Sequence, residues 1–185
     1  MPSRKERTAL ITGDGRTLPE DILEFLSWSA PYESFCIGRS YNKLIENGGL
    51  FHHWGDVDGT SSKWWADHLP DRDKVLTHTI GEAAGFDIDW EVSVPWDDHV
   101  RWRGSSSLFA AMACAEMGFE KIILAGCPLD KQGHWFWPEE YPGPDWAEED
   151  YNAWREFAKL PQAERIRSLS GFTADIMGKA DKEWV

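Results

Sequence analysis

The chain has 185 residues, a net charge of −13 and 42% hydrophobic residues. This length suits one domain with its own core, and we expect residues 1–185 to form a single unit. The acidic balance excludes general binding to a nucleic-acid backbone, which needs clustered Lys and Arg. No apolar run approaches the ~20 residues of a membrane span. Because the charged start at residues 2–7 is not an apolar signal segment, we expect a cytoplasmic location and no membrane partner.

The first 26 residues predict a strand, a glycine turn and a helix. Residues 8–12 are apolar, Gly13 and Gly15 follow, and Thr17 is a suitable N-cap for a helix with Pro19 in its first turn. This order is how nucleotide-binding α/β folds begin, although the third glycine of the dinucleotide fingerprint is absent.

The middle of the chain alternates short apolar runs with helical patterns. The strands that we predict begin near Thr8, Ser34, Leu50, Val75 and Lys121, with residues 88–94 as an ambiguous edge strand. Residues 41–46 and 63–68 predict short helices between them. The three cysteines, which have no metal-ligand spacing, are expected to be reduced core residues (Cys36, Cys114 and Cys127).

A polar turn at residues 104–107 precedes a strongly apolar helix that should end at Gly118 in a left-handed C-terminal cap. Ser105 or Ser106 could cap this helix, and its free N–H groups could face an anion. An ordinary capped core helix is the commoner meaning of such a pattern.

Beyond the strand at residues 121–125, the chain becomes rich in Pro, Gly, acidic and aromatic residues. Residues 131–150 predict an irregular surface segment lying over a site, residues 146–159 a helix, and residues 161–179 a second helical pattern interrupted at 168–173. We expect residues 131–185 to pack on the preceding α/β unit. Most of the 12 tryptophans should fill core and interface, and exposed ones in this segment would suit a homo-oligomer.

These elements predict an α/β fold: a three-layer, Rossmann-like domain with a mainly parallel central sheet. Ligands of such sheets bind beyond the carboxyl ends of the strands. That edge would carry residues 13–17, 39–40, 56–58, 104–107 and 127–130.

Two of these stretches resemble the bacterial lipooligosaccharide sialyltransferases and related Rossmann-like proteins. Residues 10–18 look like that family's opening strand and Gly-Asn-Gly-Pro-Ser-Leu loop, and residues 105–126 like its Thr-Ser-Gly helix, Gly-Tyr turn and following strand. The chain is most similar to uncharacterised phage-encoded members, with which it shares the pattern at 167–173 and Trp184; for a phage protein, the compartment would be the host cytoplasm.

The resemblance implies a nucleotide or nucleotide-sugar ligand. The positions that it places around the ligand are Gly13, Asp14, Gly15, Thr17, Ser105, Ser106 and Ser107. Three positions depart from the family: Asp14 replaces Asn and would repel phosphate unless a cation or ribose hydroxyl meets it, Arg16 replaces Pro, and Ser107 replaces Gly. Most of the C-terminal lid that supplies the family's catalytic His is missing.

The leading hypothesis is therefore a nucleotide- or nucleotide-sugar-binding protein that transfers a glycosyl group. The candidates for the base that this transfer needs are Asp56, Asp58, Asp130 and His134. One alternative is a metal-dependent enzyme in which Asp56 and Asp58, joined by His53, hold Mg²⁺ or Mn²⁺. Since the resembling transferases need no metal, we expect no cofactor. The other alternative is a non-catalytic phage accessory protein that keeps the nucleotide pocket.

Overall fold

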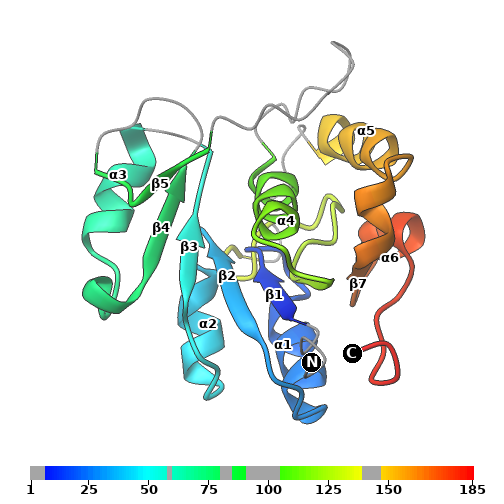
Figure 1. Ribbon diagram of the computed structural model, residues 1–185, viewed down its shortest axis with the longest axis horizontal. Coiled ribbons are helices and arrows are strands. Elements are labelled where there is room, and N and C mark those ends of the chain that lie inside the picture. The colour runs from blue at the N-terminus through cyan, green and yellow to red at the C-terminus, as the bar shows by residue number, and fades with distance from the viewer. Residues whose placement is uncertain (1–6, 58–59, 80–84, 91–104, 139–146) are drawn as a thin grey trace, which may run out of the picture.

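A parallel β-sheet with helices on both faces forms the centre of the protein (Figure 1). The computed structural model describes residues 7–57, 60–79, 85–90, 105–138 and 147–185. Its strands are β1 (Thr8–Thr12), β2 (Glu33–Ile37), β3 (His53–Gly55), β4 (Leu76–Thr79), β5 (Ile88–Asp89), β6 (Lys121–Ala125) and β7 (Ile166–Ser168). Its helices are α1 (Leu18–Ser27), α2 (Ser40–Glu46), α3 (Thr60–Asp67), α4 (Ser106–Glu116), α5 (Ala147–Phe157) and α6 (Gly171–Met177), with short 3₁₀ turns η1 (Arg72–Lys74) and η2 (Pro161–Arg165).

The strand order is β5-β4-β3-β2-β1-β6-β7, and every neighbouring pair of these strands is parallel. This confirms the predicted α/β class with a Rossmann-like, mainly parallel sheet. The chain first builds the sheet outward from β1 to β5 and then returns to place β6 on the other side of β1. The pair β1 and β6 is therefore the point where the strand order reverses.

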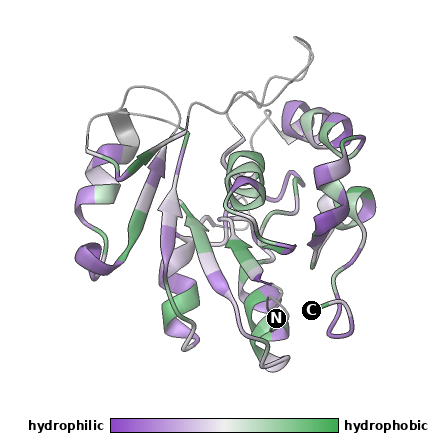
Figure 2. Ribbon diagram, viewed as in Figure 1, coloured by the Kyte–Doolittle hydropathy of each residue, from purple (hydrophilic) through white to green (hydrophobic). Residues whose placement is uncertain are grey.

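Alternating side chains of the central strands supply two apolar layers. In β1, Ala9 and Ile11 join a core cluster with α4 and α5, while Leu10 joins a second cluster with α1, α2 and α3. Because successive side chains of a strand point to opposite faces, both sides of β1 must be apolar. Figure 2 shows hydrophobic residues along the central strands and on α4.

Strand β3 begins three residues later than predicted. Residues 50–52 run beside β2 but are held by the side chain of Ser34, whose hydroxyl donates to the Leu50 carbonyl at 2.7 Å and accepts from the His52 amide at 3.0 Å. The Ser34 amide in turn donates to His52 Nδ1 at 3.1 Å. Hydrogen bonds to side chains therefore replace the backbone hydrogen bonds of a sheet in residues 50–52, and regular strand pairing begins at His53.

The interrupted helical pattern predicted for residues 161–179 is right only in part, because a strand separates its two helical pieces. This stretch forms η2, then β7 at the edge of the sheet, and only then α6. Ile166 pairs with Ile122 of β6 and is fully buried, so an edge strand outcompetes the helical pattern. Gly171 has a φ of +68°, which marks the turn between β7 and α6.

The three cysteines are buried and free, as predicted. Among the tryptophans that the structure describes, Trp54 and Trp154 are fully buried, whereas Trp64 is 56% exposed. Trp96, Trp102 and Trp146 and the residues 91–94 of the predicted edge strand lie outside the described residues. None of the helices described is both long and apolar enough to cross a lipid bilayer.

A chain of hydrogen bonds links two buried histidines, one in β3 and one in β4. Trp90 Nε1 donates to His78 Nδ1 at 2.9 Å, and His78 Nε2 lies 2.9 Å from His53 Nδ1. Since Nδ1 of His78 accepts, a neutral His78 carries its proton on Nε2 and donates it to His53. His53 Nε2 then faces Glu33 Oε2 at 3.6 Å. Both ring nitrogens of His53 therefore have partners within the sheet.

Acid is expected to destabilise the fold through these two histidines. Burial lowers the pKa of His78 to about 3 and lowers the pKa of His53. Below pH 6.5 the unfolded chain therefore binds more protons than the native state. The contribution of the neutral histidines to the free energy of unfolding is complete above the ordinary pKa of 6.5 and is lost as the pH falls from there toward 3. His78 alone should contribute a loss of about 2 kcal/mol between pH 7 and pH 5.

Urea unfolding at the two pH values measures this loss. The free energy of unfolding of His78→Gln should drop less between pH 7 and pH 5 than that of the wild type. His68→Gln, at an exposed position just after α3, should keep the wild-type drop. An equal drop in His78→Gln and wild type would show that His78 is not the titrating group.

Candidate functional site

Two loops meet at the reversal point of the sheet. The β1 loop, residues 13–17, and the β6 loop, residues 126–130, run side by side: the Gly13 amide donates to the Ala125 carbonyl and the Gly15 amide to the Gly126 carbonyl, each at 2.8 Å. In open parallel sheets, such a crevice beyond the strand ends is the usual ligand position.

Packing between these loops explains why glycine occupies residues 13 and 15. A Cβ on Gly15 would lie 2.3 Å from Pro128 Cδ and 2.7 Å from the Gly126 carbonyl oxygen. A Cβ on Gly13 would lie 2.6 Å from Cys127 Sγ. Gly126 itself has a φ of +63°. Packing against the neighbouring loop is therefore enough to require glycine at both positions.

Asp21 of α1 locks the loops to the C-terminal segment. Its Oδ2 accepts from the Gly126 amide at 2.8 Å, from Thr17 Oγ1 at 2.9 Å and from Ser170 Oγ at 2.6 Å. Burial raises the pKa of Asp21. The hydroxyl of Thr17 is thus part of this lock, and no side-chain bond from Thr17 caps α1.

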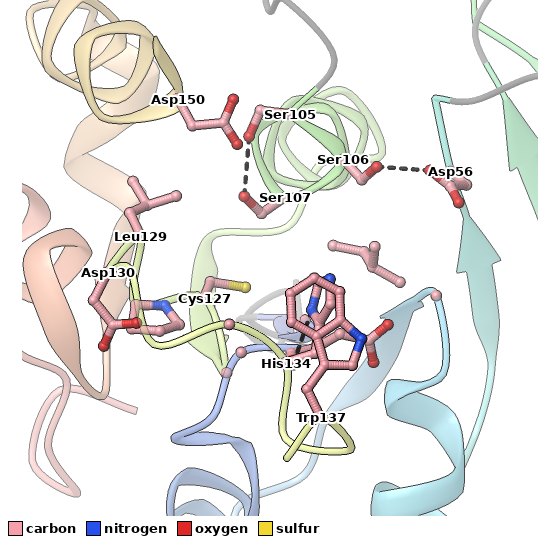
Figure 3. Close-up of a pocket in the computed structure, with 18 residues that line it drawn as sticks. Asp56, Ser105, Ser106, Ser107, Cys127, Leu129, Asp130, His134, Trp137 and Asp150 are labelled. Carbon is pink, nitrogen blue, oxygen red and sulfur yellow. Dashed lines mark hydrogen bonds between the residues drawn. The ribbon is translucent and has the colours of Figure 1, made fainter. Parts of the chain in front are cut away.

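The N-terminus of α4 faces the two loops. Ser105 is its N-cap residue, but no side-chain capping bond forms; instead Ser105 Oγ lies 3.2 Å from Ser107 Oγ. Ser106 Oγ donates to Asp56 Oδ1 at 2.7 Å, and Figure 3 shows Asp150 beside Ser105. Gly118 has the left-handed φ (+80°) predicted for the end of this helix. Two carboxylates therefore already lie at the helix end where the sequence suggested an anion.

A cavity of about 620 Å³ lies between the β1 loop, the β6 loop and α4 (Figure 3). This volume is within the range of small-molecule and cofactor sites. Its lining residues are Gly13, Asp14, Gly15, Ile37, Gly38, Asp56, Ser105, Ser106, Ser107, Gly126, Cys127, Pro128, Leu129, Asp130, Gly133, His134, Trp137 and Asp150.

The structure brings most of the sequence-predicted site residues to this one cavity. Among them are Gly13, Asp14, Gly15, Asp56, Ser105, Ser106, Ser107, Asp130 and His134. Thr17 is not in the lining, and Asp58 lies outside the described residues. Trp137 and Asp150, which also line the cavity, were not predicted as site residues. Residues 148–150 are all acidic, so the sequence does not indicate which of them faces the cavity.

Asp14 is the most perturbed carboxyl group of the cavity. Its Oδ2 accepts from the Arg39 amide at 2.9 Å and its Oδ1 from Trp135 Nε1 at 3.3 Å. Burial nevertheless raises the pKa of Asp14 to about 7, and the negative charge of Asp56 adds to the rise. Near neutral pH, Asp14 is therefore present both as a proton donor and as an acceptor.

Asp150 approaches the cavity from α5. It is 6% exposed, and burial raises its pKa to about 6. Asp130, on the β6 loop, accepts from the Gln132 amide at 3.0 Å through Oδ1. The cavity thus contains two carboxyl groups with raised pKa values, Asp14 on the β1 loop and Asp150 on α5, which is a common feature of functional sites.

His134 keeps one ring nitrogen unprotonated. Its Nδ1 lies 3.3 Å from the Asp14 carbonyl oxygen, which can only accept, so Nδ1 carries the proton and Nε2 keeps its lone pair. Burial lowers the pKa of His134, so the imidazole is neutral at neutral pH. A β-bridge between Gly15 and His134 and stacking on Phe136, at 5.2 Å between ring centroids, hold the side chain in place.

Aspartates dominate the charge of the cavity. Four of the lining residues are aspartates, and none of the described lining residues is Lys or Arg. Such a lining accepts hydrogen bonds from hydroxyl and amino groups and repels an anion inside the cavity. Around Asp56, no group of three or more His, Cys, Asp or Glu suited to a metal is present in the described part of the chain.

Comparisons with protein-family models, with curated proteins and with solved structures gave no match. The fold and the cavity therefore define the class of this protein: a Rossmann-like α/β protein with an aspartate-rich cavity where its strand order reverses.

Proposed function

We propose that the protein binds a nucleotide or nucleotide sugar in the cavity between the β1 loop and α4. The observation that carries this proposal is that residues 13–15 and 105–107, far apart in the sequence, line opposite parts of one cavity at the reversal point of the sheet. The resemblance of both stretches to nucleotide-sugar transferases supports the same ligand class.

The lining groups suit the sugar part of such a ligand. Asp14 and Asp56 can accept hydrogen bonds from ribose or sugar hydroxyls, and the hydroxyls of residues 105–107 can donate or accept. Trp137 provides an aromatic surface for a ring. Acidic side chains commonly bind ribose hydroxyls in Rossmann-type sites.

Glycosyl transfer is the reaction that these groups could support. Nε2 of His134 would take the proton of the acceptor hydroxyl as the bond to the sugar carbon forms. The bond to the nucleotide phosphate would break, and the phosphate oxygen would leave with the electron pair. A protonated Asp14 could donate a proton to that leaving group at or below neutral pH.

Ligand-induced thermal stabilisation tests the binding proposal. A panel of nucleotides and nucleotide sugars should contain a compound that raises the melting temperature, because a ligand at ~100-fold excess over Kd stabilises the native state by about 2.7 kcal/mol. Ser106→Trp should fill the cavity and abolish the gain. Ser27→Trp, at an exposed position of α1, is the matched control and should keep it. Circular dichroism must first show that both variants are folded.

The outcomes separate the candidate functions. Full stabilisation of folded Ser106→Trp would place the ligand elsewhere. If the stabilising nucleotide sugar is also hydrolysed or transferred, the protein is an enzyme; binding without turnover supports the non-catalytic alternative. Stabilisation that disappears in chelator would favour Mg²⁺ or Mn²⁺ at Asp56 and Asp58, whereas we expect equal stabilisation with and without chelator.

A further inference from the structure

Arg39, directly after β2, is held between two aromatic side chains. Its guanidinium carbon lies 4.8 Å from the ring centroid of Trp65 and 4.7 Å from that of Phe136. Trp65 belongs to α3 and Phe136 to the segment after the β6 loop, so three separate parts of the chain meet at this side chain. Both rings lie within cation–π distance of the guanidinium, so they attract it and restrict the positions that it can take.

This arrangement lies at the rim of the cavity. Arg39 follows Gly38, which is in the lining, and its amide donates to Asp14 Oδ2 at 2.9 Å. Phe136 lies between His134 and Trp137 in the sequence, and both of these residues line the cavity. The positive charge of Arg39 also acts on the pKa values of Asp14 and His134.

The guanidinium N–H groups of Arg39 have no acceptor within the described part of the chain, and the residue is exposed. Arg16, in the β1 loop, differs: it donates to the carbonyls of Gln132, Trp137 and Pro138 at 3.0–3.3 Å. Arg7 pairs with Glu33 at 2.8 Å. Arg39 is therefore a cation held near two rings, and its donors are available to a ligand.

We propose that Arg39 binds the phosphate of the ligand at the cavity rim. This inference rests on the proposed function and names the contact that recognises the anion. The aspartates of the cavity and the two carboxylates at the α4 N-terminus disfavour phosphate inside, so the nucleoside part enters and the phosphate stays at the rim. A guanidinium can donate two parallel N–H bonds to phosphate oxygens, and here its contacts with Trp65 and Phe136 restrict it before binding.

Pairs of ligands that differ only in phosphate test this assignment. Each common nucleoside and its 5′-monophosphate are titrated by calorimetry into wild type, Arg39→Gln, Arg39→Lys and, as matched control, Arg155→Gln. Arg155 is also exposed and lies 5.9 Å from one aromatic ring, that of Tyr151 on α5. In the wild type and Arg155→Gln, phosphate should tighten binding about tenfold or more.

In Arg39→Gln, the monophosphate should bind no more than about twofold tighter than the nucleoside, while the nucleoside Kd stays the same. Arg39→Lys should give an intermediate ratio because a lysine donates as a point charge. An unchanged ratio in Arg39→Gln would overturn the assignment. A purely structural role would instead weaken nucleoside and monophosphate equally, which would also overturn it.

Chemical labelling with phenylglyoxal provides an arm that does not depend on nucleotide binding. Inorganic phosphate should protect Arg39, but not Arg155, from modification, as read by peptide mass spectrometry. If the wild type binds neither nucleosides nor nucleotides, the proposed function fails; protection by phosphate would still support Arg39 as an anion site, and equal labelling with and without phosphate would contradict it.

Discussion

Gly15→Val is expected to destabilise the fold by about 3 kcal/mol, with no ligand involved. The β6 loop covers the position that a side chain would take: a Cβ would lie 2.3 Å from Pro128 Cδ and 2.7 Å from the Gly126 carbonyl oxygen. The Gly15 amide donates to that same carbonyl at 2.8 Å, so the loops cannot separate without losing this bond. Urea unfolding followed by circular dichroism measures the loss.

Gly48→Ala is the matched control for this experiment. Gly48 has no atom within 4 Å of an added Cβ, but its φ of +79° makes an alanine strained. Its cost should be about 1–2 kcal/mol, the cost of the left-handed conformation alone. If Gly15→Val unfolds at the wild-type urea concentration, the two loops are not packed as described, and residue 15 would again be a candidate for close contact with a ligand.

Asp21→Ala should destabilise the protein by a similar amount, about 3 kcal/mol. The substitution removes the acceptor for three donors and leaves the buried Gly126 amide without a partner. Because Ser170 connects through Asp21 to the β1 loop, the variant should also loosen the C-terminal segment. Limited proteolysis should then cut residues 170–185 faster, and urea unfolding gives the free energy.

Two variants distinguish the loss of the three hydrogen bonds of Asp21 from the loss of a negative charge. Asp21→Asn keeps one carbonyl oxygen and should lose less stability than Asp21→Ala. Asp175→Ala removes a carboxylate from an exposed position of α6 and should change the free energy of unfolding by less than about 0.5 kcal/mol. Equal free energies of unfolding of Asp21→Ala and Asp175→Ala would show that the hydrogen bonds of Asp21 do not stabilise the fold.

The central strands could be predicted from the sequence because burial on both faces leaves a local pattern. Residues 8–12 and 121–125 are short apolar runs, and the observed β1 and β6 have those bounds. The start of α4 could also be predicted, since a polar turn precedes a long apolar helix. In such elements, the residues alone determine the structure.

The features that could not be predicted depend on contacts between segments that are distant in the sequence. β7 is a strand because Ile166 pairs with β6, although its neighbours look helical. The inward turn of Asp150, and the meeting of Arg39 with Trp65 and Phe136, depend on where α5, α3 and the segment after β6 pack. No local pattern contains that information.

The glycines of the β1 loop show the same limit in another way. Their presence suggested close approach of a nucleotide to the backbone, but in the structure the Cβ positions of Gly13 and Gly15 are closed by the β6 loop. The sequence could predict that residues 13–15 and 105–107 meet at one edge of the sheet, whereas the reason for the glycines could not be predicted. Glycine is selected both where another loop packs closely and where a ligand approaches the backbone, so its presence does not distinguish the two causes.

Nuclear magnetic resonance of the ¹⁵N-labelled protein tests the central claim most directly. The best-binding nucleotide from the panel is added, and amide shift changes are mapped on the chain. If the cavity between the β1 loop and α4 is the nucleotide site, the amides of residues 13–15 and of residues 105–107 should shift together and saturate with one Kd. Shift changes confined to other parts of the chain, or none with any nucleotide at millimolar concentration, would contradict the account.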